Sequence, residues 1–278
     1  MSLDIIALVA ITFIGATVNG ALGYGFSSLT VPVALIFYTN RLLNPALVLL
    51  EVVLNAHVLW TNRIGIASVW RRVLPIIIGL LPGVAVGTYL LHSVHPGWVK
   101  LLTYVTLAPL ILIQAGGIKR PLRSERAAGL ALGTGVGVLY SITTISGPPL
   151  ALLFNNQGYS KLDFRAGLGL VRLAESSLTA AFYLSAGIFT LQSIQLIPII
   201  IPSILIGIPL GAYIIRHMSS EKFRRFCMSF DAWIVGYGLS RVLRELHLVE
   251  GPSAYFALAL ISGIDLILLI RFFRKLKS

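Results

Sequence analysis

Arg172 and Glu175 are charged residues within an apolar stretch of the chain, near residues 166–187. A charge inside a membrane costs about 2.5–3.5 kcal/mol on insertion scales, so it is expected to face a cavity or a partner. The spacing of three residues places both side chains on one helix face, where they could form a structural ion pair. Alternatively, the planar guanidinium of Arg172 could bind the oxygens of a carboxylate, sulfonate or phosphate. Neither interpretation excludes the other.

Hydroxyl-bearing residues gather at two breaks that are rich in Gly, Ser and Thr, Gly20–Ser28 and Ser141–Gly147. Pro32 and Pro148 are expected to begin the helices that follow, because proline favours the first helical turn. Free amides and the positive helix dipole would then point into each break, as at an anion site. The small residues could instead serve only close helix packing. The candidate anion ligands are Asn19, Tyr24, Ser27, Ser28, Thr30, Thr143, Thr144 and Ser146.

Two carboxylates occupy matching positions in the two halves of the chain, Glu51 and Glu175. Burial raises the free energy of the charged form of a carboxyl group, so either residue could carry a proton during transport. His57 lies six residues after Glu51 and is a further candidate for proton coupling, although a lone histidine is more often structural. Asp231 and Asp265 have no matching partner, and we expect them to be structural or to pair with nearby arginines.

The composition places these residues in a membrane protein. The chain has 278 residues, of which 56% are hydrophobic and 12% are charged, whereas soluble domains carry about 25% charged residues. The net charge of +12 lies in short clusters between apolar stretches, which indicates membrane topology rather than nucleic-acid binding. Cys227 is the single cysteine, so an internal disulfide and a cysteine-based metal site are excluded. We expect no cofactor and no metal.

The apolar stretches predict an all-α polytopic membrane protein with about 9–11 membrane segments, since roughly 20 helical residues span a bilayer. Two stretches are only about half that length, which predicts broken or re-entrant helices lining a cavity. The stretches lie near residues 5–22, 26–39, 43–61, 73–92, 98–117, 127–143, 147–157, 166–187, 191–215, 226–246 and 253–270.

The two halves of the chain resemble each other, which predicts an internal repeat. Residues 1–120 would form the first repeat and residues 121–250 the second, and residues 251–278 would add a C-terminal membrane helix with a basic cytoplasmic tail. The small-residue patterns predict tight helix contacts. The matched features are Gly20 with Gly137, Pro32 with Pro149, Glu51 with Glu175, and Gly83-x-x-x-Gly87-x-Tyr89 with Gly207-x-x-x-Gly211-x-Tyr213. The small-residue patterns are Gly79-x-x-x-Gly83-x-x-x-Gly87 and Ser203-x-x-x-Gly207-x-x-x-Gly211.

The distribution of loop charges predicts the orientation. If each short pair of segments returns the chain to the side it entered from, only Arg41, Lys100, Arg241 and Arg244 lie outside the cytoplasm. The N-terminus is then outside, the C-terminus is cytoplasmic, and the second repeat is inverted, as in many secondary transporters. The expected cytoplasmic loop residues include Arg63, Arg71, Arg72, Lys119, Arg120, Arg123, Arg216, Lys222, Arg224 and Arg225.

The glycine and proline pattern resembles that of the TauE/SafE family of membrane permeases over nearly the whole chain. Gly15–Gly25 leads into Val31-Pro32, and Gly129–Gly137 leads into Gly147-Pro148-Pro149. The resemblance implies a bacterial plasma-membrane protein that moves sulfite, sulfonates or related organic anions. The chain departs from the usual glycine cluster at Gly23–Ser28, where the residues are bulkier and more polar.

The leading hypothesis is a secondary transporter that binds a small anion at a midplane site and works by alternating access. Its partners would be the anion and the lipid bilayer, and the chain could assemble as a homodimer. The alternative is an intramembrane enzyme such as a lipid-phosphate hydrolase, with Ser27, Glu51 and Arg172 in its site. Familiar hydrolase motifs such as His-Glu-x-x-His and Gly-x-Ser-x-Gly do not occur in the sequence, which disfavours the enzyme. A membrane scaffold or receptor is a third possibility.

Overall fold

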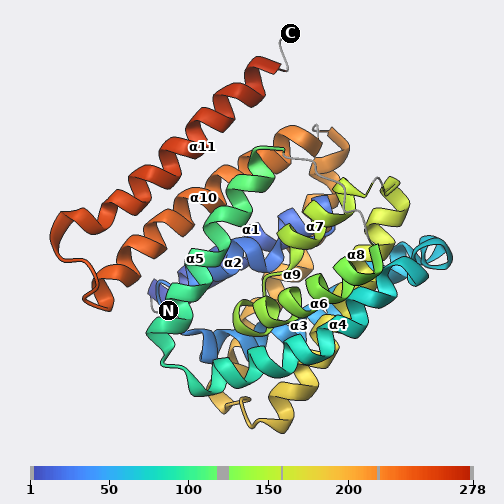
Figure 1. The fold of residues 1–278 in the computed structure, drawn as a ribbon, viewed down its shortest axis with the longest axis horizontal. Helices are drawn as coiled ribbons and strands as arrows, with labels where there is room; N and C mark the ends of the chain where they lie inside the picture. The colour runs from blue at the N-terminus through green and yellow to red at the C-terminus, as the bar shows by residue number, and fades with distance from the viewer. Residues whose placement is uncertain (1–2, 118–124, 158, 218–219, 276–278) are drawn as a thin grey trace. The chain divides into compact units, whose positions relative to one another are not determined.

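The computed structural model describes residues 3–117, 125–157, 159–217 and 220–275, and over these residues the chain is helical, with no β-strand. The expected all-α fold is therefore confirmed. The helices are α1 (Leu3–Leu22), α2 (Phe26–Ala34), α3 (Asn40–Thr61), η1 (Arg63–Gly65), α4 (Ile66–Ser93), α5 (Pro96–Ala115), α6 (Glu125–Thr143), α7 (Gly147–Asn156), α8 (Lys161–Ser185), α9 (Leu191–His217), α10 (Ser220–Glu245), η2 (Gly251–Tyr255) and α11 (Phe256–Lys275) (Figure 1).

Within the described residues, six helical segments are long and apolar enough to cross a membrane. The chain is thus a multi-pass membrane protein, as its composition predicts. Helices α8 and α10 are also long, at 25 and 26 residues, but carry more charge. The larger number of 9–11 segments counts these and the short helices, and it remains a prediction. The six are Leu3–Leu22, Asn40–Thr61, Arg63–Ser93, Pro96–Ala115, Leu191–His217 and Gly251–Arg274.

The chain divides into two compact units, and each takes helices from both halves of the sequence. Unit 1 contains Met1–Thr39, His95–Ile118 and Ser203–Ser278, and unit 2 contains Asn40–Val94 and Lys119–Pro202. The expected repeat boundary between residues 120 and 121 lies outside the described residues, as do Lys119, Arg120 and Arg123. The two repeats and their inverted relation remain a prediction.

In unit 2, the glycine pattern of α4 packs directly against α6. A Cβ atom at Gly79 would lie 2.3 Å from the Leu130 carbonyl oxygen, and one at Gly83 would lie 2.2 Å from the Thr134 carbonyl oxygen. Any side chain larger than hydrogen would push the helices apart. The predicted tight contact is confirmed, and it fixes α6, which leads into the second break.

In unit 1, the matching pattern of α9 packs against α1. The Ser203 hydroxyl donates to the Val9 carbonyl at 3.1 Å, and a Cβ at Gly211 would lie 1.8 Å from the Thr17 carbonyl oxygen. The second predicted small-residue contact is therefore also confirmed. It fixes α1, the helix that leads into the first break.

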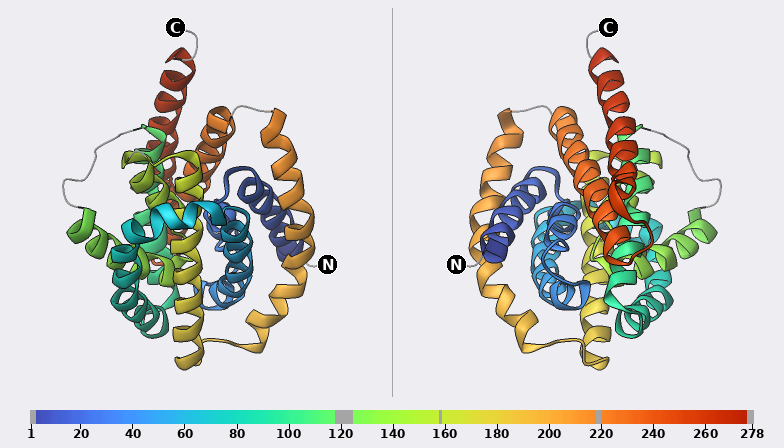
Figure 2. Two further views of the ribbon diagram at one scale, coloured as in Figure 1. Left: turned by 90° about the vertical axis from the view of Figure 1, so that its right-hand side faces the viewer. Right: turned by 90° about the vertical axis from the view of Figure 1, so that its left-hand side faces the viewer.

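Helices α10 and α11 of unit 1 run side by side, joined by the short helix η2 (Figures 1 and 2). Their contact includes a buried ion pair at 2.8 Å between the Arg225 Nη1 and Asp265 Oδ1 atoms. The expected role of Asp265 as the partner of an arginine is confirmed. The placement of Arg225 in a loop was wrong, because this arginine lies in α10 and its side chain is buried.

The two short helices have the expected lengths, but the first begins earlier than predicted. Helix α2 starts at Phe26, so Pro32 lies inside it and not in its first turn. The reason is Gly25, whose left-handed φ of 108° lets the chain turn directly into a helix. The Pro32 carbonyl oxygen accepts a hydrogen bond at 2.8 Å from the Tyr104 hydroxyl of α5. Pro148 stands at the start of α7, as predicted.

Candidate functional site

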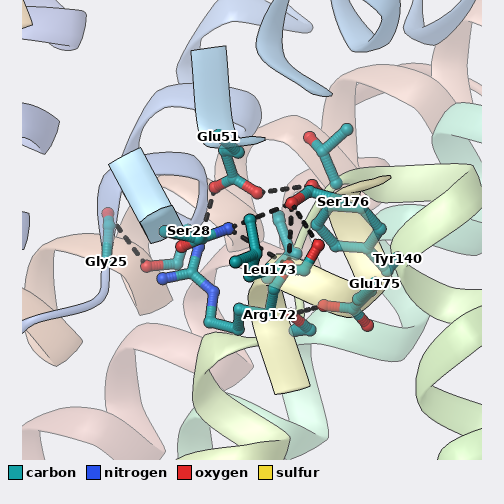
Figure 3. Close-up of polar contacts among 12 residues, drawn as sticks. Gly25, Ser28, Glu51, Tyr140, Arg172, Leu173, Glu175 and Ser176 are labelled. Atoms are coloured by element: carbon teal, nitrogen blue, oxygen red, sulfur yellow. Dashed lines mark hydrogen bonds and ion pairs between the residues drawn. The ribbon is translucent and has the colours of Figure 1, made fainter. Parts of the chain in front are cut away.

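A buried polar cluster in unit 2 surrounds Arg172 of α8. The Arg172 Nη2 atom lies 2.8 Å from the Glu51 Oε1 atom of α3. The Tyr140 hydroxyl of α6 donates to the other Glu51 oxygen at 2.7 Å. Figure 3 shows Glu51 between these two donors. Three helices therefore meet at one carboxylate, and Arg172 and Glu51 are 3% and 0% exposed.

The second carboxylate of the cluster, Glu175, accepts a hydrogen bond through Oε2 from the Ser146 hydroxyl at the second break. The expected ion pair between Arg172 and Glu175 is therefore not the contact that forms. Although three residues apart on one helix, the two side chains make their close contacts with different elements, Arg172 with α3 and Glu175 with the start of α7. Tertiary packing has overridden the local pairing that the spacing allows.

Part of the cluster's hydrogen-bonding capacity is unused. Among the described residues, the Nε and Nη1 atoms of Arg172 have no hydrogen-bond partner, and neither has the Oε1 atom of Glu175. A buried donor left without an acceptor costs about 1–3 kcal/mol or more. A guanidinium in this state is well suited to bind an oxyanion, which would satisfy its remaining N–H groups.

The backbone of α8 around Arg172 is held from α3. The Asn55 side-chain amide donates to the Arg172 carbonyl oxygen at 3.3 Å, and its Nδ2 atom lies 3.4 Å from the Ser176 hydroxyl oxygen. The Ser176 hydroxyl donates to the same Arg172 carbonyl at 2.8 Å. These contacts fix the backbone of α8 at Arg172. The residue is therefore held at its main chain as well as at its guanidinium.

The second break contains Thr143, Thr144 and Ser146, all of them buried. Thr144 has a φ of 56°, an uncommon left-handed conformation for a β-branched residue. The Thr143 hydroxyl donates to the Leu139 carbonyl and accepts from the Ile145 amide, and the Thr144 hydroxyl donates to the Thr143 carbonyl. These hydroxyls thus stabilise the break itself.

The start of α7 offers fewer amide donors than expected. Pro148 and Pro149 occupy two of its first three positions and have no N–H group. The positive end of the helix dipole remains. Of the first three residues of α7, however, Gly147 alone has an amide hydrogen to donate. Ser146, immediately before the helix, is engaged by Glu175.

His57 is exposed on α3, whereas Glu51 on the same helix is buried. A separation of six residues places the two side chains well apart around the helix axis. The structure therefore does not bring His57 to the cluster, and its role in proton coupling remains a prediction. Asp231 is buried in α10 of unit 1, and its Oδ1 atom has no hydrogen-bond partner among the described residues.

The candidate ligands of the first break all lie in unit 1 and are buried. The Ser28 hydroxyl donates to the Gly25 carbonyl at 3.2 Å, which uses it locally. The hydroxyl oxygen of Thr30 and the Oδ1 atom of Asn19 have no partner within the described residues. Tyr24 lies in the turn between α1 and α2 and is 7% exposed. The buried residues of this group are Asn19, Tyr24, Ser27, Ser28 and Thr30.

Tyr140 is the residue of the Arg172 cluster that sequence reasoning missed. A signal was present, because Tyr140 directly precedes the second break and Tyr24 lies at the first. Sequence reasoning also missed that Arg172 is not the single buried arginine among the described residues. Arg225 is equally buried but was counted with the loop charges, because it follows Lys222 and Arg224 in a basic run.

Comparison with known proteins adds two findings. A family model described as sulfite exporter TauE/SafE matches residues 8–237. A probable sulfite/organosulfonate exporter TauE of Cupriavidus necator is 28% identical over 181 residues, which cover 63% of this chain and 68% of the relative. No solved structure matches the chain.

Proposed function

Because the chain belongs to the sulfite exporter TauE/SafE family, we propose that it is a secondary transporter of a small oxyanion, either sulfite or an organosulfonate. Family membership and the membrane helices support transport of an anion across a membrane. The name of the relative from Cupriavidus necator supports the choice of sulfur oxyanions. We place the protein in the plasma membrane, with its N-terminus outside and its C-terminus in the cytoplasm.

The observation that carries the proposal is the state of Arg172. Its guanidinium is 3% exposed, is held by Glu51 through Nη2, and retains two nitrogen atoms without partners. A buried cation held from one side is pre-organised to receive an anion from another, and a planar guanidinium suits the oxygens of sulfite or sulfonate. We assign Arg172 as the principal anion ligand.

The charges of the cluster favour coupling to protons. One guanidinium, that of Arg172, stands in a cluster with two carboxyl groups, Glu51 and Glu175, and all three side chains are buried. A bound anion adds a further negative charge, which is costly at low dielectric unless a proton enters with it. Glu175 is the preferred proton carrier, because a single donor, Ser146, satisfies it and its Oε1 atom has no partner among the described residues. Glu51 is held by Arg172 and Tyr140.

Alternating access requires two halves that can rock against each other. The proposal is supported by the packing of the two small-residue patterns, because each pattern packs against a helix from the other half of the sequence. The pattern of α4, from the first half of the sequence, packs on α6 of the second half, and the pattern of α9 packs on α1 of the first half. Such an exchange of partners is expected of two related repeats.

Transport is tested with purified protein in sealed vesicles. The proposal predicts uptake of isotope-labelled sulfite or an alkylsulfonate without chemical change of either. An Arg172→Ala variant that is folded and inserted should not support uptake. Release of phosphate from a phosphatidic acid substrate, with no anion uptake, would instead support the intramembrane hydrolase. Uptake by Arg172→Ala at the wild-type rate would remove this residue from the site.

A further inference from the structure

The turn between α10 and α11 of unit 1 (Figure 1) borders an open cavity of about 600 Å³. Two residues in left-handed conformations reverse the chain there, His247 with a φ of 53° and Gly251 with a φ of 70°. The Leu258 amide donates to the Ser240 hydroxyl at 3.1 Å, which joins the two helices beside the turn. The volume is that of a small-ligand pocket, since such pockets measure roughly 300–1,000 Å³. The lining includes Tyr237, Arg241, Arg244, Glu245, Glu250 and Tyr255.

The cavity lies at one end of a helical segment that is long and apolar enough to cross a membrane, Gly251–Arg274. Gly251 and Tyr255 belong both to this segment and to the lining of the cavity. Tyrosine is enriched at the interface between water and hydrocarbon, and Tyr237 also lines the cavity. The cavity is therefore expected at the depth of the lipid headgroups.

The lining contains one cation and one anion without an ionic partner. Arg241 and Glu245 form a pair with each other at 2.9 Å. Arg244 and Glu250 form no ion pair within the described residues. A ligand that carries only a negative charge would leave Glu250 without a counter-charge. A zwitterion with a phosphate and an ammonium group would match both residues.

The unpaired cation is held at the edge of the cavity by Tyr255. The Arg244 Nη1 atom donates to the Tyr255 hydroxyl at 3.1 Å, and the Arg244 Cζ atom lies 5.7 Å from the centre of the Tyr255 ring. This separation is within the range of a cation–π contact. The hydrogen bond uses one guanidinium N–H group, so the others can bind the oxygens of a phosphodiester.

An apolar surface begins directly beside the cavity. Phe256 follows Tyr255 in the chain and is 71% exposed. The exposed side chains at helical spacing after it are apolar, so they form one face of α11 on which acyl chains could lie. A water-soluble ligand would gain nothing from this face. Its large residues are Phe256, Leu260, Ile264, Leu266, Ile267 and Ile270.

From this arrangement we infer that the cavity binds the headgroup of phosphatidylethanolamine, with the phosphate at Arg244 and the ammonium at Glu250. The inference is independent of the proposed transport function. A primary ammonium can donate hydrogen bonds to a carboxylate, whereas the quaternary ammonium of phosphatidylcholine cannot. Phosphatidylglycerol has no positive charge to place beside Glu250. Soluble glycerophosphoethanolamine has the same polar groups, and the experiment must separate it from the lipid.

The test measures lipid binding to purified, delipidated protein by native mass spectrometry. The wild type should bind phosphatidylethanolamine about tenfold more tightly than phosphatidylcholine or phosphatidylglycerol. Arg244→Gln and Glu250→Gln should each weaken this binding about tenfold, because each removes one charge-assisted contact. Arg271→Gln and Glu221→Gln remove the same charges at exposed positions outside the cavity, so they should bind as the wild type does.

The choice of lipid separates a binding role from a structural one. Glu250→Gln leaves the lining with an excess of positive charge, so this variant should prefer phosphatidylglycerol to phosphatidylethanolamine. Arg244→Lys should recover part of the affinity that Arg244→Gln loses. Equal phosphatidylethanolamine affinities in the cavity variants and their controls would overturn the site, and so would a wild-type preference for phosphatidylglycerol. Glycerophosphoethanolamine should compete only weakly, and binding as tight as that of the lipid would assign the cavity to a soluble ligand instead.

Discussion

Arg172 and Glu51 are joined at 2.8 Å between Nη2 and Oε1, although 120 residues separate them in the sequence. Glu51 lies in α3 and Arg172 in α8, and these two helices pack against each other in unit 2. The pair thus joins α3 to α8, and it also holds a guanidinium that could bind an anion. Variants can separate these roles, because stability depends on compensated charge, whereas anion binding depends on the guanidinium itself.

The first prediction concerns this pair. Arg172→Met should lower the free energy of unfolding by about 3–5 kcal/mol, because it leaves a buried carboxylate without its counter-ion. Combining it with Glu51→Leu should recover most of that loss. Neither protein should transport sulfite. Thermal unfolding in detergent and vesicle uptake measure the two properties, and a double variant that transports normally would contradict the assignment of Arg172.

The second prediction concerns proton coupling through Glu175. The charged and titratable groups around it are Arg172, Glu51 and Tyr140. Glu175→Gln keeps an oxygen that can accept from Ser146 but cannot titrate, so the protein should fold and the pH dependence of transport should flatten. An alkylsulfonate is the right substrate, since it stays ionised across the neutral range.

Matched variants make the pH experiment decisive. Glu221→Gln, an exposed change on α10, should keep the wild-type pH profile. Glu51→Gln should alter the profile less than Glu175→Gln, because Arg172 and Tyr140 hold Glu51. Unchanged profiles in both site variants would reject proton coupling through these carboxylates.

Much of the fold could be predicted from the sequence, because it depends on local chemistry. The apolar stretches gave the helical membrane fold, and the Gly-x-x-x-Gly patterns gave close contacts that the structure contains. The length of the second short helix followed from Pro148 and the residues after it. The first began earlier, because a left-handed conformation at Gly25 cannot be read from composition alone.

The site was harder to predict, because its contacts join residues far apart in sequence. Spacing suggested that Arg172 pairs with Glu175, but α3 brings Glu51 to the guanidinium instead. The same limitation hid Tyr140, whose partner lies on another helix. A run of basic residues is also assigned to a loop when only charges are counted. Arg225 belongs to such a run, but it is buried against α11.

The third prediction concerns the contact between α4 and α6. A Cβ at Gly133 would lie 2.1 Å from the Ile76 carbonyl oxygen, so Gly133→Ala must separate two backbones. We expect a loss of about 1–3 kcal/mol in stability, as for other overpacked interfaces. Gly135 lies on the same helix with nothing within 4 Å, so Gly135→Ala should be neutral or slightly stabilising. Equal melting temperatures of the two variants would contradict the packing.

The fourth prediction concerns the ion pair that joins α10 to α11. Asp265→Asn should destabilise the protein by about 3–5 kcal/mol, because Arg225 is buried and loses its counter-ion. Arg225→Met together with Asp265→Leu should recover stability and keep transport per folded molecule. The exposed Arg241–Glu245 pair on the same helix is the control, and Arg241→Gln should cost less than about 1 kcal/mol. A loss of transport in the stable double variant would show that the pair does more than hold α11.

The fifth prediction concerns the orientation of the chain. Cys227 is the only cysteine, so a Cys227→Ser protein is a clean background for single-cysteine labelling. Ile64, before α4, is 82% exposed, Lys222 is exposed at the start of α10, and Leu248 follows the end of α10. A membrane-impermeant maleimide applied to intact cells should label Leu248→Cys, whereas Ile64→Cys and Lys222→Cys should react only after the membrane is opened. Labelling of Ile64→Cys and Lys222→Cys from opposite sides would be incompatible with two inverted repeats, and alternating access around Arg172 would have to be replaced by another mechanism.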